Sequence, residues 1–111
     1  MKRVFGVILL FLQPVVVLAA SVSGTLVGGG GIDDMGLVVV DDKGQRVDAY
    51  CLSACGDWFT EADKDDVVHL KSSYQGRKVL LQYTSEPNHD RIAGPGSEDL
   101  INFITAVRFL K

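Results

Sequence analysis

The stretch LVVVDDKGQRVDAYC at positions 37–51 decides the fold class of this chain. Positions 37–40 form a continuous apolar run, which is typical of a strand buried on both faces. Positions 41–44 form a turn cluster, and positions 46–51 alternate between apolar and polar side chains. We therefore predict an antiparallel hairpin of two strands joined by a tight turn.

The N-terminal residues have the layout of a secretory signal peptide. Lys2 and Arg3 precede an apolar run, which ends before small residues at 19–21 that suit cleavage. A membrane anchor is the alternative, but a glutamine and a proline interrupt a run that barely reaches the roughly 18–20 residues of a span. We predict removal of residues 1–20, a single mature domain at 21–111, a periplasmic or secreted location and no lasting membrane anchor.

Without this leader the chain would be one small acidic domain. The leader carries two of the eleven Lys and Arg residues and none of the fourteen acidic ones. The remainder therefore has nine basic and fourteen acidic side chains. Such a surface repels phosphate backbones, and we expect no nucleic-acid partner. A domain of this size builds a thin core, which a covalent crosslink would reinforce.

Cys51 and Cys55 follow the hairpin as a C-x-x-x-C pair. Thiol oxidoreductases use C-x-x-C, and a zinc site needs more ligands than this spacing supplies. Cysteines of exported proteins usually pair, so we predict a disulfide, with free or intermolecular thiols and metal or redox chemistry as alternatives. The short loop would add about 2 kcal/mol of stability. Trp58 is expected to plug one end of the core, and an exposed partner anchor is the alternative.

The remaining segments predict three more strands and one helix. Positions 21–27 and 78–84 are rich in Val and Thr or alternate in polarity, as strands do. Thr60 followed by acidic residues predicts a helix start, and apolar residues at helical spacing extend the helix to position 74. The final segment, 100–110, matches both a helical stripe and a strand alternation, and its Ile, Phe, Thr and Val residues favour a strand.

The resulting order, β-β-β-α-β-β, resembles the OB-fold, a five-stranded barrel with a helix between its third and fourth strands. This resemblance rests on element order and length and implies a mainly β, barrel-like mature domain. The competing fold is an α+β sandwich in which 100–110 is helical. The segment from GRKV at 76–79 to NHDRIAGPG at 88–96 also resembles a pattern in small exported bacterial proteins, and that likeness implies no activity.

The acidic pairs and the glycine run match no metal or cofactor motif. The pairs at 33–34 and 41–42 lack the D-x-[DN]-x-[DN]-G pattern of a calcium loop. The glycines at 28–31 precede Ile and Asp, where a P-loop needs Lys and Ser or Thr, so we expect a flexible connection between strands. We therefore predict neither a metal nor a cofactor.

The OB-fold resemblance implies that two loops, 28–34 and 85–99, edge the ligand surface. The first offers carboxylates and bare backbone, and the second offers a histidine and an arginine. Arg91 is the expected anchor because arginine is enriched in binding hot spots; alternatively it merely pairs with Asp33 or Asp90. The expected partner-binding residues are Asp33, Asp34, Trp58, His89 and Arg91.

A catalytic role would require a nucleophile beside His89. Ser85 and Ser97 flank the same loop, but no nucleophile-elbow pattern surrounds either one. We therefore expect a non-catalytic protein that binds another macromolecule outside the cytoplasm, as an inhibitor or immunity-type protein does. A module for a small ligand or an oligosaccharide is the alternative. An acidic protein would associate fast with basic partners such as lysozyme.

Overall fold

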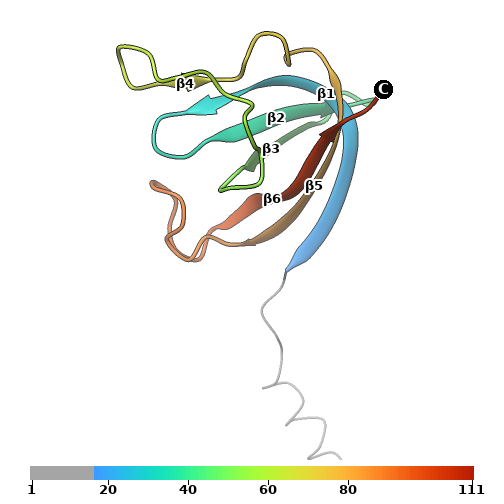
Figure 1. The fold of residues 1–111 in the computed structure, drawn as a ribbon. Coiled ribbons are helices and arrows are strands. Elements are labelled where there is room, and N and C mark those ends of the chain that lie inside the picture. Colours follow the sequence, from blue (N-terminus) through green and yellow to red (C-terminus); the bar gives the residue numbers. More distant parts are fainter. Residues whose placement is uncertain (1–16) are drawn as a thin grey trace, which may run out of the picture.

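The computed structural model describes residues 17–111, and its regular structure in that range is entirely β (Figure 1). Most of the predicted leader, residues 1–16, lies outside the described residues, while Leu18 already belongs to the first strand. The six strands are β1 (Leu18–Gly31), β2 (Gly36–Asp41), β3 (Arg46–Tyr50), β4 (Val68–His69), β5 (Lys78–Pro87) and β6 (Leu100–Phe109).

The long strand β1 pairs along both of its edges. Its first part, from Leu18 to Thr25, is antiparallel to β5, and its second part, from Gly24 to Gly30, is antiparallel to β2. The register with β2 shifts between Leu26 and Gly28, which marks a bulge, and bulges bend a strand. β1 therefore belongs to two parts of the sheet, one paired through β5 and the other through β2.

This double pairing bends the sheet into a partly closed ring. The strand order is β2-β3-β6-β5-β1-β4, and the additional β1–β2 pairing brings the sheet back on itself. The ring is uneven, because β3 and β6 run parallel and share one residue pair, Tyr50 with Phe103. Beside that pair, the Asn102 side-chain amide donates to the carbonyl of Asp48 at 2.9 Å. The mainly β, barrel-like class is confirmed.

The predicted hairpin and the predicted final strand are confirmed. β2 and β3 pair antiparallel from Gly36 with Tyr50 to Val40 with Arg46, and the Asp41 carboxylate accepts backbone hydrogen bonds within the turn. β6 pairs with β5 along its whole length, so the α+β alternative is wrong. The local pattern left open whether residues 100–110 form a helix or a strand. They form a strand paired with β5, and their β-branched and aromatic residues suit such a half-buried sheet.

The helix predicted between Thr60 and position 74 is wrong. The Asp63 carboxylate accepts hydrogen bonds from the backbone amides of Asp65 and Val67, and this local turn competes with helical pairing. The chain then forms β4, which pairs with Gly30 and Gly31 of β1. Among residues 17–111 there is no helix long and apolar enough to cross a membrane.

The core fills the inside of the ring. Cys51 and Cys55 are both buried in it and form the predicted disulfide, with 5.3 Å between their Cα atoms. Trp58 is half-buried and stacks on Phe109, with 4.4 Å between the ring centroids, so it packs against the edge of the core. The most deeply buried apolar side chains are Leu26, Leu37, Val39, Val79 and Leu81.

The glycine run is paired strand, and the prediction of a flexible connection is wrong. Gly28, Gly29 and Gly30 pair with β2, and Gly30 also pairs with β4. Gly30 has a φ of +131°, and a Cβ there would overlap the carbonyl oxygen of Val68. The run allows three strands to approach closely, which a side chain would prevent.

We predict that Gly30→Ala lowers the free energy of unfolding by about 1–3 kcal/mol, because alanine would be strained at this φ. Gly28→Ala is the matched control, since a Cβ at that position meets nothing within 4 Å. Urea denaturation of both variants measures the difference. Equal effects of the two substitutions would show that close strand approach at Gly30 is unimportant.

Candidate functional site

Three loops meet at one end of the ring: the β1–β2 turn (32–35), the segment before β4 (60–67) and the β5–β6 loop (88–99). β4 pairs with the end of β1, which places the second loop beside the first. The Asp34 carboxylate accepts a hydrogen bond of 3.1 Å from the backbone amide of Ala93, which joins the first loop to the third. We call these three loops the acidic end.

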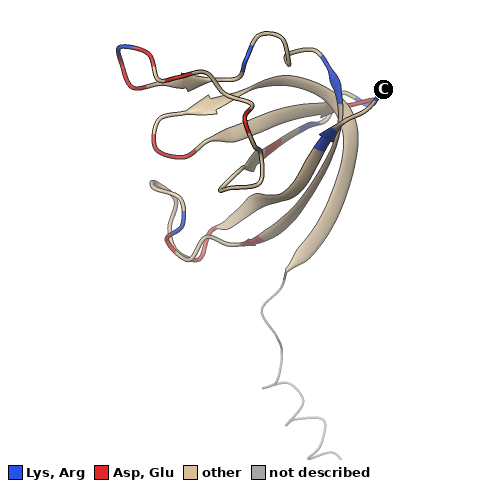
Figure 2. Ribbon diagram, viewed as in Figure 1, with Lys and Arg blue, Asp and Glu red and all other residues tan. Residues whose placement is uncertain are grey.

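The acidic end carries nine of the fourteen Asp and Glu residues and only two of the eleven Lys and Arg residues. In the ribbon of Figure 2 many of the acidic residues lie on these loops, and several Lys and Arg residues lie near the C-terminus. Two large apolar side chains, Ile32 and Leu100, are about 60% exposed in or next to these loops. Concentrated negative charge beside exposed apolar groups is suited to binding a positively charged surface.

The β5–β6 loop is held in shape by Asn88, whose side chain is completely buried. Its amide donates to the carbonyls of Ile92 and Pro95, and its oxygen accepts from the amide of Ile92 at 2.8 Å. The next two residues, His89 and Asp90, both have positive φ. The loop is therefore preorganised, which lowers the entropic cost of binding.

Arg91 is fixed by intramolecular contacts. Its guanidinium pairs with Glu86 at 2.8 Å, donates to the carbonyls of Pro87 and Asn88, and lies 3.9 Å from the centroid of the Phe103 ring. The alternative prediction, a pairing of Arg91 with Asp33 or Asp90, named the wrong partner, because the guanidinium pairs with Glu86. The Arg91 side chain remains about one-third exposed, so its main visible role is to brace the loop.

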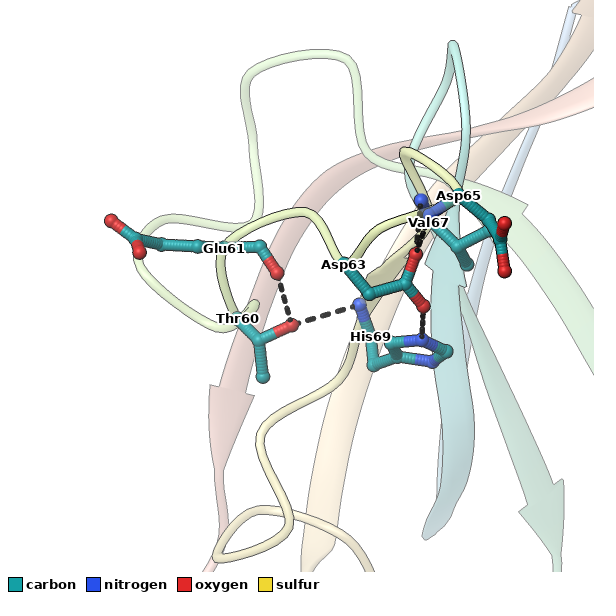
Figure 3. A network of polar contacts seen from close by, with 6 residues as sticks. All are labelled: Thr60, Glu61, Asp63, Asp65, Val67 and His69. Carbon is teal, nitrogen blue, oxygen red and sulfur yellow. Dashed lines mark hydrogen bonds and ion pairs between the residues drawn. The ribbon is translucent and has the colours of Figure 1, made fainter.

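A second polar network shapes the loop before β4 (Figure 3). The imidazole of His69 contacts the Asp63 carboxylate at 3.0 Å, and the Thr60 hydroxyl accepts a hydrogen bond from the His69 amide. The contact with His69, followed by the backbone amides of Val67 and Asp65, holds the pKa of Asp63 below its ordinary value. The carboxylate therefore stays ionised at the tip of an already acidic loop.

A groove of about 410 Å³ runs over β1, β2 and β3 next to the acidic end. The bare backbone of the glycine run forms one part of its lining, and Asp34, Asp48 and Tyr50 add two carboxylates and an aromatic ring. Asp48 is paired with Arg46 at 2.7 Å. This volume falls in the usual range for ligand-binding clefts.

The structure places the other predicted site residues in two settings. Asp33 and His89 are exposed on different loops of the acidic end, whereas Trp58 packs with Tyr74 and Phe109. The backbone amide of His89 donates to the carbonyl of Ser97. Within residues 17–111, no group of three or more His, Cys, Asp or Glu side chains is placed to hold a metal ion.

Sequence reasoning missed Asn88, Asp48 and Tyr50. The alternation of residues 46–51 already places Asp48 and Tyr50 on the outer face of their strand, and that signal would have identified them. A buried asparagine in a loop leaves no comparable pattern, because its partners are backbone atoms. Comparison of the chain with family models, with curated proteins and with solved structures finds no match.

We predict that Asn88→Ala destabilises the protein by about 1–3 kcal/mol, since it leaves the buried amide of Ile92 without its partner. Asn102→Ala is the control, because that side chain makes one exposed hydrogen bond. Thermal unfolding and hydrogen exchange of the loop amides measure both effects. Unchanged exchange in the Asn88 variant would contradict the assigned role.

Glu86 gives a test that depends on pH. Hydrogen bonds from the Thr84 hydroxyl and then from Arg91 lower the pKa of Glu86. A lowered folded-state pKa contributes stability above the ordinary glutamate pKa, and this contribution is lost as the pH falls through the folded value. We predict that Arg91→Ala raises the pKa of Glu86, as followed by NMR titration of its carboxylate. An unchanged value would show that the ion pair does not form in solution.

Proposed function

We propose that this protein is an exported, non-catalytic binding protein whose acidic end docks on a basic macromolecule outside the cytoplasm. The observation that carries the proposal is the convergence of three acidic loops at one end of the ring, joined by the contact of Asp34 with Ala93. Steering between opposite charges raises association rates, and the exposed Ile32 and Leu100 offer apolar contact area.

Export is supported by two features. The N-terminal residues have the composition of a secretory leader. The Cys51–Cys55 disulfide suits an oxidising compartment, where such bonds persist. A small acidic exported protein of this kind fits an inhibitor or immunity-type role against a basic lytic enzyme.

We further infer that the ring is an OB-like barrel. A three-strand meander (β1, β2, β3) is followed by two strands that return between β3 and β1, and β1 is shared between β2 and β5. In OB-folds the second and third strands and two of the loops form the ligand surface. By this analogy the groove and the acidic end form one binding surface.

The groove also supports the alternative, a site for an oligosaccharide. A tyrosine ring beside two carboxylates and bare backbone offers both stacking and hydrogen bonding to a sugar. Tyr50→Ala would then abolish glycan binding with little dependence on salt. Recovery of glycan alone from an extracytoplasmic extract would favour this alternative.

The proposal predicts that charge reversal at the acidic end slows association with a basic partner such as lysozyme. Asp33→Lys should lower the association rate several-fold at low salt, because it removes one negative charge and adds a positive one. Asp42→Lys in the β2–β3 turn changes the net charge equally but lies outside the acidic end. Surface plasmon resonance across salt concentrations compares both variants with the wild type.

Equal slowing by the two substitutions would mean that only net charge matters, and it would contradict a specific acidic docking surface. Association that does not depend on salt would contradict the proposal as well. Stoichiometric capture of one basic protein from an extracytoplasmic extract, lost in the Asp33 variant and kept in the Asp42 variant, is the expected result.

A further inference from the structure

The disulfide loop, residues 51–55, is joined to the β1–β2 turn by a backbone hydrogen bond. The backbone amide of Cys51 donates to the carbonyl of Met35 at 2.8 Å. Within the loop, the amide of Ala54 donates to the carbonyl of Cys51. Both sulfur-bearing side chains are buried. The loop is therefore anchored at both ends, and its tip carries Leu52.

Leu52 combines two features that core packing does not explain. Its side chain is 52% exposed, and its φ is +49°, in the left-handed region that favours glycine and disfavours a leucine. Non-glycine residues in this region persist where the surrounding structure forces them, and they gather at binding sites. The anchored loop thus presents an apolar side chain to solvent in an unfavourable backbone conformation.

A small hollow adjoins Leu52. It has a volume of about 220 Å³ and is lined by Met35, Phe59 and the disulfide as well as by Leu52 itself. Ligand clefts usually have volumes of about 300–1,000 Å³, so the hollow is too small for a complete ligand of that kind. It is much larger than the roughly 10–15 Å³ of such space that one water molecule needs, which leaves room for a single inserted side chain.

The hollow borders the acidic end. Met35 directly follows Asp33 and Asp34, and Phe59 directly precedes the loop at 60–67. An apolar centre surrounded by polar groups is the usual arrangement of a binding hot spot, where the rim excludes water from the centre. Because this rim is negatively charged, it favours a partner whose inserted side chain is surrounded by positive charges.

We propose that the hollow beside Leu52 receives one large apolar side chain of the partner, flanked there by Lys or Arg residues that face the acidic end. This inference rests on the proposed function and adds the recognition element, a basic segment with a projecting Leu, Met or Phe. Leu52 packs against the inserted side chain, and the disulfide keeps the hollow open.

The test uses the disulfide-intact protein, labelled with ¹⁵N, and two amidated peptides, Lys-Lys-Phe-Lys-Lys and Lys-Lys-Ser-Lys-Lys, titrated at low salt. The phenylalanine peptide should bind at least fivefold more tightly and shift the amide signals of Leu52, Ser53 and Gly56. Equal affinity of the two peptides overturns the inference but leaves the proposed function intact, because the charges alone then bind. Binding of neither peptide counts against both.

Leu52→Gly separates binding from folding. Glycine accepts the positive φ, so this variant should keep or raise the melting temperature while its affinity for the phenylalanine peptide falls to that of the serine peptide. Val27→Ala shortens another exposed apolar residue, on β1, and should leave the affinity unchanged. Full affinity in the Leu52 variant, or an equal loss in the Val27 variant, overturns the inference.

Discussion

Backbone pairing of one strand along both of its edges is the constraint on which this structure depends. β1 is long enough to hold β5 with its first part and β2 with its second. Glycines in the second part let the neighbouring backbones approach, since a Cβ at Gly30 would overlap the carbonyl oxygen of Val68. Without this double pairing the sheet would stay open, and the buried Leu26 of β1 would lose the packing around it.

The same strand gathers the acidic loops. It ends at Gly31, where the β1–β2 turn begins and where β4 pairs, and the turn holds the β5–β6 loop through Asp34. Two of the loops are held by internal hydrogen bonds, one through Asn88 and the other through Asp63. The end of the ring therefore presents ordered, like-charged loops, whose mutual repulsion a positively charged partner would relieve.

The sequence predicted the hairpin from local alternation, the last strand from its β-branched and aromatic composition, and the disulfide from the cysteine pair. The barrel-like sheet was predicted from the order and length of the elements. Prediction from the sequence failed where a side chain captures the backbone, since Asp63 forms a turn in a segment with helical apolar spacing. It also failed where a distant strand gives a residue its purpose. Gly30 fits a linker until β4 is seen to pair with it. The ion-pair partner of Arg91 was also missed, because the fold of the chain brings Glu86, five residues earlier, to its guanidinium.

Whether β1 is shared between the two parts of the ring can be tested directly by NMR. Thr25 lies opposite Val40 of β2 and also opposite Lys78 of β5. We predict cross-strand nuclear Overhauser effects from the backbone protons of Thr25 to both of these residues in the disulfide-intact protein. Contacts to Lys78 alone, with β2 paired solely to β3, would describe an open sheet and contradict the account.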